Sequence, residues 1–222
     1  MTLSGRRILV TSGPTRAPLD AVRFLTNKST GRLGALIAEA AVQAGADVTF
    51  VYGRGSDTPA VRGGHQDHLR LLSVDTVDDL IAVFKKELPT GYDAVVHAMA
   101  VLDFEPAEVR EEKTSSDLSE WVVRLTPTPK ASRLVKTLAP KTCFVGFKLE
   151  VGKERDELLE ISSAWAAKNG ADLVVANDLR DIEGGLHIGY LIRNGMVEAI
   201  AEGKEAIARV VVDFLGRSLK DR

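Results

Sequence analysis

The sequence predicts an α/β fold in three layers, in which helices cover both faces of a mainly parallel sheet. Short apolar runs alternate with helical patterns over most of the chain, as in sheets built from helical crossovers. The first apolar run leads through a loop into a glycine-bearing helix start. Near the end, Asn194-Gly195 separates two strand-like runs, which indicates an antiparallel hairpin. These observations describe a Rossmann-like fold, and we expect a single domain over residues 1–222.

The first half of the chain predicts three strands and two helices. Aliphatic and β-branched residues fill the strands, the first helix carries apolar residues on all sides, and a capping residue begins the second helix, which Pro89 stops. In chain order these elements are the strand Arg6–Ser12, the helix Leu33–Ala44, the strands Asp47–Tyr52 and Leu69–Val74, and the helix from Asp75 or Thr76 to Leu88.

The second half continues this alternation with one interruption. Residues 104–125 are charged and broken by proline, which is typical of a flap over a ligand site, although a solvated connection fits the charges equally. Thr128 as N-cap and Pro129 at the first helical position predict a helix start. The remaining expected elements are the strands Ala94–Val101, Trp121–Leu125, Thr142–Lys148 and Asp172–Ala176, the helix Lys153–Lys168, the hairpin Leu186–Arg193 with Val197–Ala201, and the helix Lys204–Leu219.

Composition limits the partners of the protein. Its 29 Lys and Arg residues stand against 31 Asp and Glu residues, a formal net charge of -2, and no long basic run occurs. We therefore expect neither nucleic acid nor a membrane as partner. The N-terminus lacks the apolar core of a signal peptide and no apolar stretch reaches membrane-spanning length, so we expect a cytoplasmic protein. Cys143 is the only cysteine, which excludes an internal disulfide.

The stretch Thr26–Gly34 predicts an anion-binding site where the first long loop enters a helix. Gly31 and Gly34 let the backbone approach a ligand without interference from side chains. The helix that begins there presents unpaired N–H groups and the positive end of its dipole. Both features favour a phosphate group.

Polar and glycine residues gather at the carboxyl ends of the expected strands, where ligands of open α/β sheets bind. Two glycine-bearing turns, two lysines and two amides in one place suit a nucleoside phosphate together with a second anionic group. The residues at these ends are Gly13, Asn27, Ser29, Gly31, Asp103, Lys113, Phe147, Lys148 and Asn177.

Two common nucleotide-binding motifs are missing from the sequence. The P-loop pattern G-x-x-x-x-G-K-[ST] does not occur. The dinucleotide fingerprint is not met either, because Gly13 and Gly31 lie too far apart and no Asp or Glu ends the strand Asp47–Tyr52. The residues alone predict a nucleotide-binding α/β enzyme of unassigned chemistry. An NAD(P)-dependent reductase and a non-catalytic nucleotide-binding module are the alternatives.

Several sequence blocks resemble the motifs of the phosphopantothenoylcysteine synthetase family. They follow the order of the family and cover nearly the whole chain. The decarboxylase half that is fused to many bacterial members is absent, so the resemblance implies the stand-alone form. The blocks are Ile8–Thr15, Val22–Phe24, Asn27–Gly34, His97–Phe104, Lys113–Ser116, Thr126–Lys130, Gly146–Glu150 and Ala176–Leu179.

The resemblance implies a ligase of coenzyme A biosynthesis. In this family 4'-phosphopantothenate is activated by CTP or ATP to an acyl nucleotidylate with release of pyrophosphate, and the amine of L-cysteine then attacks to form an amide. The bacterial-type resemblance favours CTP. A homodimer is also implied, and Mg²⁺ bridging the phosphates is expected from the chemistry, while no acidic pair in the sequence marks metal ligands.

The matching positions also carry expected roles. Asn27 orients the substrate carboxylate or the acyl carbonyl, and Lys113 neutralises phosphate charge during activation; these two form the expected catalytic set. Arg23 reaches the phosphate of the substrate from the neighbouring subunit. The expected substrate-binding set is Arg23, Asn27, Ala100 and Asp103, and the expected nucleotide-binding set is Gly13, Ser29, Gly31, Gly34, Asp103, Pro129, Phe147, Lys148, Lys168 and Asn177.

The nucleotide site departs from the bacterial pattern at two places. The flap reads Lys113-Thr114-Ser115-Ser116 where many bacterial members have a lysine-rich segment, and Ala164 replaces a lysine one helical turn before Lys168. Gly146–Glu150 is closer to the version in eukaryotic and stand-alone bacterial members. These changes leave the choice between CTP and ATP open.

Overall fold

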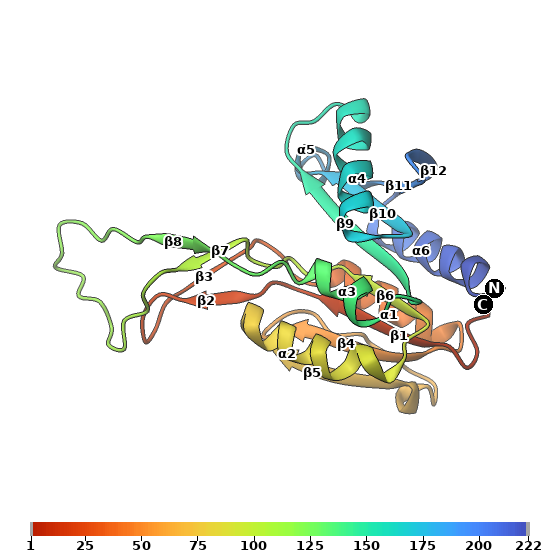
Figure 1. The fold of residues 1–222 in the computed structure, drawn as a ribbon, viewed down its shortest axis with the longest axis horizontal. Coiled ribbons are helices and arrows are strands. Elements are labelled where there is room, and N and C mark those ends of the chain that lie inside the picture. Colours follow the sequence, from red (N-terminus) through yellow and green to blue (C-terminus); the bar gives the residue numbers. More distant parts are fainter. Residues whose placement is uncertain (1, 221–222) are drawn as a thin grey trace.

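The computed structural model describes residues 2–220, which build one eight-stranded sheet between two layers of helices (Figure 1). The parallel strands are β1 (Arg7–Ser12), β4 (Asp47–Gly53), β5 (Leu69–Val74), β6 (Ala94–His97), β9 (Cys143–Glu150) and β10 (Leu173–Asp178), and the antiparallel strands are β11 (Ile188–Arg193) and β12 (Met196–Glu202). Their order across the sheet is β12-β11-β10-β9-β6-β1-β4-β5. The parallel part follows the doubly wound order 3-2-1-4-5-6, which confirms the predicted fold class.

Helices cover the sheet because its central strands are apolar on both faces. In β1, Ile8 and Val10 join the core cluster beneath one helical layer, while Leu9 joins the cluster on the opposite face. Successive side chains of a strand point to opposite faces, so a strand covered on both sides reads as a continuous apolar run. One layer contains α1 (Arg32–Gln43) and α6 (Lys204–Ser218), and the other contains α2 (Val77–Glu87), α3 (Ser132–Leu138) and α4 (Arg155–Asn169).

Two antiparallel ribbons project from the sheet as an arm, at the left of Figure 1. The arm comprises residues 16–26 and 104–127. The first ribbon pairs β2 (Arg16–Pro18) with β3 (Phe24–Thr26), and the second pairs β7 (Phe104–Pro106) with β8 (Leu125–Pro127). The sequence predicted only a loop for the first ribbon, because strands of three residues carry no periodic signal. Three short helical segments complete the fold: η1 (Gln66–His68), η2 (Leu88–Thr90) and α5 (Leu179–Glu183).

Two local predictions are confirmed in atomic detail. Thr76 caps α2 in a reciprocal capping box, since its side chain accepts from the Asp79 N–H and the Asp79 side chain accepts from the Thr76 N–H. Asn194 and Gly195 have φ values of 50° and 76°, the left-handed conformation that a two-residue hairpin turn of type I′ requires. The hairpin of β11 and β12 therefore forms where the sequence indicated.

Two strand predictions are wrong in their extent. The apolar run Ala94–Val101 forms a strand only as far as His97, because β1 ends at Ser12 and only an isolated bridge between Pro14 and Ala100 continues the pairing. The segment Trp121–Leu125 contributes only Leu125 to a strand; Val122 and Val123 are exposed and have no neighbouring strand to pair with. Apolar residues form a strand only where a partner strand is in reach.

The predicted helix start at Thr128 is also wrong. Helix α3 begins at Ser132, with Ala131 at its N-cap and no side-chain cap. The hydroxyl of Thr128 instead donates to the Leu102 carbonyl at 2.5 Å. This bond connects the segment before α3 to the segment after β6. The threonine therefore makes a tertiary contact instead of capping the helix.

Gly146 of β9 leaves space for the indole of Trp165, and this contact provides a test of the packing. A Cβ at Gly146 would lie 2.3 Å from two ring carbons of Trp165, which also packs against Phe144. We expect Gly146→Ala to lower the free energy of unfolding by about 1–3 kcal/mol through overpacking, as measured by urea denaturation. Gly146→Ala combined with Trp165→Leu should cost less than the sum of the single variants, and strict additivity would contradict this account.

Candidate active site

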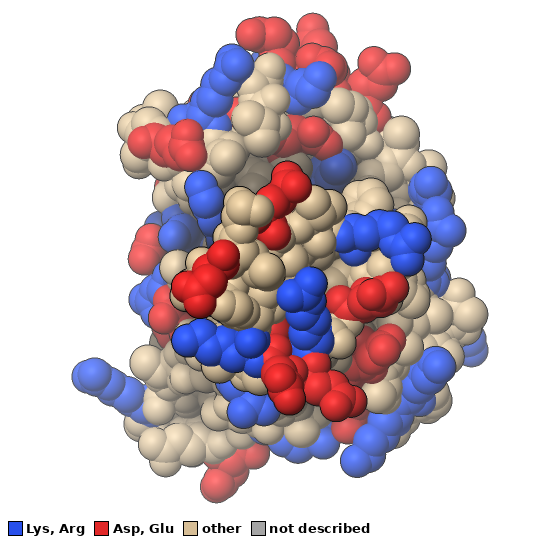
Figure 2. Space-filling view, turned by 90° about the vertical axis from the view of Figure 1, so that its left-hand side faces the viewer, with Lys and Arg blue, Asp and Glu red and all other residues tan. Residues whose placement is uncertain are grey.

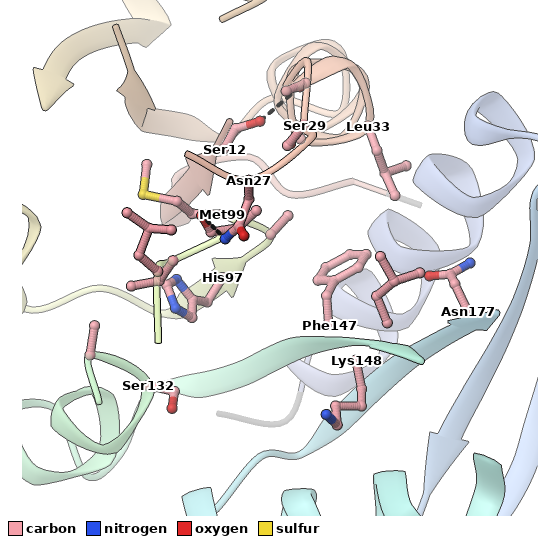
Figure 3. A pocket seen from close by; sticks show the side chains of 18 of the residues that line it. Ser12, Asn27, Ser29, Leu33, His97, Met99, Ser132, Phe147, Lys148 and Asn177 are labelled. Atoms are coloured by element: carbon pink, nitrogen blue, oxygen red, sulfur yellow. Dashed lines mark hydrogen bonds between the residues drawn. The ribbon is translucent and has the colours of Figure 1, made fainter. Parts of the chain in front are cut away.

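A cavity of about 880 Å³ opens at the carboxyl ends of β1, β6, β9 and β10 (Figure 3). It lies beside the switch point of the sheet, between β1 and β6, where the chain connections run in opposite directions. Within residues 2–220, β4 and β5 contribute nothing to its lining. The cavity therefore lies away from the end of β4, the position at which a dinucleotide-binding fold holds the ribose of its ligand.

The start of α1 forms one wall of the cavity. Gly31 is the N-cap residue with φ 81°, and neither a side-chain cap nor an acidic residue occupies the first turn. Ser12 Oγ donates to the Gly31 carbonyl at 2.7 Å, a bond drawn in Figure 3. A Cβ at Gly34 would lie 2.3 Å from Ser12 Oγ, so glycine is required for this close approach. The helix start thus presents backbone N–H groups to an anion.

Asn27 is held against the opposite wall by a single hydrogen bond. Its Nδ2 donates to the Ala100 carbonyl at 3.1 Å (Figure 3), and the same carbonyl accepts from Thr15 N at 3.2 Å. An amide has two N–H donors and one acceptor oxygen, so one N–H and Oδ1 of Asn27 are available to a ligand. The side chain is half-buried and fixed at the cavity surface.

The cavity concentrates positive charge in a protein whose net charge is -2. Asp103 is the one acidic residue of its described lining, and its Oδ1 lies 2.5 Å from Lys130 Nζ. Lys148 forms a second pair at the rim, with Glu150 at 2.6 Å. A cationic cleft of this kind attracts a polyanion. The lining cations are Lys28, Arg32, Lys130, Arg133, Lys148, Lys168 and Lys204.

The end of the cavity at β9 and β10 combines aromatic and aliphatic side chains with polar ones. Phe147 and Lys148 follow each other in β9 and project from opposite sides of the strand (Figure 3). Asn177 is the second-last residue of β10, and its Nδ2 donates to the Ile188 carbonyl at 2.6 Å. Leu33, Leu179 and Ile182 are further lining residues in this region. A planar group could pack against Phe147 here.

His97 lies buried at the end of β6. Its Nδ1 is 2.6 Å from Thr11 Oγ1, and its ring meets the Phe84 ring edge-on at a centroid distance of 5.6 Å. Burial lowers the pKa of His97 to about 4, so the imidazole is neutral at pH 7.

The arm is held together by one buried carboxylate. Asp20 Oδ2 lies 2.6 Å from Arg23 Nη1 and accepts from Thr114 N at 3.0 Å, while Oδ1 accepts from Val22 N and Arg23 N. Burial opposes ionisation of Asp20, but the hydrogen bonds from Val22, Thr114 and Arg23 outweigh it and hold its pKa well below the usual range. The face of the molecule at the arm shows acidic and basic side chains interspersed (Figure 2).

Comparison with known proteins assigns the family. Residues 3–217 match the sequence profile of the DNA/pantothenate metabolism flavoprotein C-terminal domain. The chain belongs to this family. A bifunctional coenzyme A biosynthesis protein CoaBC from Thermococcus kodakarensis is 38% identical over 180 residues, which cover 81% of this chain and 43% of that protein. The chain therefore spans less than half the length of this curated relative.

Two solved structures of the family share the fold along nearly the whole chain. The DNA/pantothenate metabolism flavoprotein from Streptococcus pneumoniae has a TM-score of 0.87 and 28% identity, over 96% of this chain and 100% of that chain. The C-terminal domain of a CoaBC protein has a TM-score of 0.76 and 28% identity, over 99% of this chain and 98% of that one. The family resemblance stated from the motifs is thus confirmed.

Most of the residues carried over from the family resemblance lie around one cavity, whereas Gly13, Arg23 and Lys113 do not line it. Gly13 packs against Ser56, because a Cβ there would meet its hydroxyl at 1.9 Å. Arg23 and Lys113 belong to the arm. Those that line the cavity are Asn27, Ser29, Gly31, Gly34, Ala100, Asp103, Pro129, Phe147, Lys148, Lys168 and Asn177.

Sequence reasoning missed several lining residues. Lys28, Arg32 and Lys130 stand inside the recognised motif blocks, so a count of basic residues there could have found them. Arg133 lies outside all of the motif blocks. His187 immediately precedes β11 and Lys204 begins α6, and no local pattern connects these positions with the first strand.

The described residues contain no group of three His, Cys, Asp or Glu side chains arranged to hold a metal ion. Asp103, the acidic group in the cavity lining, is already paired with Lys130. The residues present therefore do not fit a protein-held magnesium site. None of the helices within residues 2–220 has the length and apolar character of a membrane span.

The lowered pKa of His97 predicts a pH-dependent stability. The unfolded state has a pKa near 6.5 and the folded state about 4, so the unfolded state binds more protons between these values. Stability should fall as the pH falls from 6.5 to 4, by about 3 kcal/mol at most. His97→Gln should flatten the pH profile of urea unfolding in this window. His65→Gln, at an exposed position, should leave the profile unchanged; an equal slope in wild type and His97→Gln would contradict the assignment.

Removing the charge of Asp20 should loosen the arm. Asp20→Asn weakens the ion pair with Arg23 and the acceptor for Thr114 N. We expect cleavage by a protease within residues 107–124 to accelerate about 10-fold, because charge-assisted bonds of this kind contribute about 1.5–3 kcal/mol, while the sheet stays folded by circular dichroism. Asp117→Asn, an exposed change in the same segment, is the matched control. Equal cleavage rates in both variants would show that Asp20 does not hold the arm.

Proposed function

We propose that this chain is the ligase that joins 4'-phosphopantothenate to L-cysteine in coenzyme A biosynthesis, with a nucleoside triphosphate as the activating co-substrate. The cavity carries the proposal, because it combines an uncapped helix start, a fixed amide at Asn27 and seven cations against one acidic residue. A nucleoside triphosphate and a phosphorylated acid together bring many negative charges, which such a site can balance. Relatives named as coenzyme A biosynthesis proteins and the family match support the same reading.

The first step forms a bond between substrate and nucleotide. A carboxylate oxygen of 4'-phosphopantothenate attacks the α-phosphorus, the bond to the β-phosphate oxygen breaks, and pyrophosphate leaves. Negative charge builds on the phosphates, and the N–H groups of α1 with the lining lysines would stabilise it. The free N–H of Asn27 would orient the carboxylate.

The second step forms the amide. The unprotonated amine of L-cysteine attacks the acyl carbon, the bond from that carbon to the nucleotide phosphate oxygen breaks, and the nucleoside monophosphate leaves, while the amine nitrogen loses a proton to solvent. The Asn27 amide would donate to the acyl oxygen in both steps. We favour CTP as the nucleotide, with ATP as the other candidate. Mg²⁺ would arrive bound to the phosphates, since residues 2–220 contain no group of three side chains arranged to hold it.

We also propose a homodimer in which the arm serves the neighbouring site. Arg23 lies at the arm, outside the cavity of its own chain, where it pairs with Asp20. Apolar side chains on the arm are exposed, including Val22 at 59% and Phe24 at 46%. Exposed apolar surface of this kind favours association. Arg23 of one protomer would then bind the substrate phosphate in its partner, and Lys113 would reach the site with the flap.

Pyrophosphate release tests the proposed activity. With 4'-phosphopantothenate and Mg²⁺, we expect release with CTP and slower release with ATP, and amide product only when L-cysteine is added. Asn27→Ala should lower kcat by about 100- to 1000-fold, as loss of one donor to a developing charge does. Lys113→Ala should lower it by about 10-fold or more.

Two control variants show whether a loss of activity in Asn27→Ala or Lys113→Ala comes from the site or from a general effect of substitution on folding. Asn194→Gly changes an exposed turn asparagine whose positive φ glycine accepts, and Lys85→Ala removes an exposed lysine of α2; both should keep full activity. Nucleotide binding without any turnover would instead favour a binding module. NADPH-dependent absorbance changes without pyrophosphate would favour a reductase.

A further inference from the structure

His187 is a polar residue in the cavity wall that the proposed reaction does not use. Both its ring nitrogens are buried and, among the described residues, have no hydrogen-bond partner. Its backbone has φ 42°, a left-handed conformation that non-glycine residues rarely adopt. Unsatisfied buried polar atoms and strained backbone both cost stability, and they cluster where ligands bind.

The surrounding structure holds His187 in this position from both sides. The Gly203 N–H, just before α6, donates to the His187 carbonyl at 3.1 Å. The Asn177 side chain donates to the carbonyl of Ile188, the next residue, at 2.6 Å. The backbone of His187 is therefore fixed between the end of β10 and the start of α6, while its imidazole is left without partners.

The protonation state and the neighbours of His187 suit a nucleobase better than a phosphate. Burial, and then the charge of Lys204, lower the pKa of His187, so the ring is neutral at pH 7. A neutral imidazole has one donor and one acceptor, whereas a phosphate offers acceptors only. The same end of the cavity is walled by Leu33, Phe147 and Ile182, which fit a planar base.

Asn177 fixes which edge of a base this end can accept. Because the Ile188 carbonyl can only accept, the amide of Asn177 must turn its NH₂ group towards it. Its oxygen is then the atom left for a ligand, and Figure 3 shows it on the side towards Phe147. An oxygen acceptor pairs with an exocyclic amine. Cytosine and adenine carry such an amine beside an unprotonated ring nitrogen, whereas uracil carries a carbonyl beside a ring N–H.

We propose that His187 is a specificity-determining residue that donates a hydrogen bond to the ring nitrogen next to the amine bound by Asn177. This inference rests on the proposed nucleotide-dependent reaction and deepens it. A rotation of the imidazole on nucleotide binding brings its N–H to the cavity surface and gives one of its two unpartnered nitrogens a hydrogen-bond partner. Among CTP, ATP and UTP, the site then selects the two whose base carries the amine, CTP and ATP.

Calorimetric titration with CTP, ATP and UTP, each with Mg²⁺ and without 4'-phosphopantothenate, tests this selection. Wild type should bind CTP and ATP about 10-fold or more tightly than UTP, since UTP leaves the Asn177 oxygen facing a carbonyl. His187→Phe keeps the ring shape but has no nitrogen. This substitution should weaken the binding of CTP and of ATP about 10-fold and change the affinity for UTP by less than about 2-fold.

Thermal unfolding separates ligand recognition from a structural role. His187→Phe removes two unsatisfied buried atoms, so its Tm should stay equal or rise by about 2–4 °C. A residue that only supports the fold would lower Tm on substitution. His65→Phe, in an exposed loop outside the cavity, should change neither binding nor Tm.

The outcomes distinguish this inference from the function on which it rests. If wild type binds no nucleotide, the proposed reaction fails. If wild type binds CTP and His187→Phe keeps its affinity and base preference, only the role of His187 fails. If His187→Phe does not fold, imidazole NMR of wild type decides, with the signal assigned in His187→Asn. That signal should shift with CTP and not with inorganic tripolyphosphate, and an unmoved signal would overturn the inference.

Discussion

The site depends on one topological constraint, the reversal of chain direction beside β1. Strand β1 lies between β4 and β6, and the chain moves outward in opposite directions from this centre. Right-handed crossovers in opposite directions place their helices on opposite faces, so α1 covers one face and α3 the other. The strand ends between them are covered by neither helix. The cavity occupies that gap, which is why distant segments of the chain meet in it.

The chemistry of the cavity follows from what each strand end contributes there. The β1 side supplies Asn27 and the uncapped start of α1, and the β9 and β10 ends supply Phe147, Lys148 and Asn177. Acidic residues are nearly absent from this lining although they outnumber basic ones in the whole sequence. Charge is therefore segregated within the molecule, with a cationic cavity in an acidic chain. A small polyanion would gain from this field without the protein acquiring a general affinity for nucleic acid.

Sequence reasoning succeeded where burial dictates the pattern and failed where tertiary contacts do. The strands β1, β4, β9 and β10 are recognisable because both of their faces are covered, and the turn Asn194-Gly195 because its conformation needs those residue types. The end of β6 and the hydroxyl of Thr128 could not be placed, since each depends on a partner far along the chain.

The same distinction applies to the site. The sequence motifs identified Asn27 and Gly31 as site residues. His187 is recognised only in the structure, where its ring nitrogens have no hydrogen-bond partner among the described residues. A missing hydrogen bond has no signature in sequence. Residues of this kind are recognised by the buried polar groups that lack a hydrogen-bond partner in the folded protein.

The arm shows how a buried charge can couple two segments that belong to different parts of the chain. Asp20 comes from the first ribbon and Thr114 from the flap, and the Asp20 carboxylate accepts from both segments. Separating the two segments would take the acceptor away from the N–H of the buried Thr114, so the ribbon and the flap have an energetic reason to move together. Arg23 and Lys113 lie next to these contacts in the sequence. If both residues serve a neighbouring cavity as proposed, the Asp20 carboxylate would couple their movement.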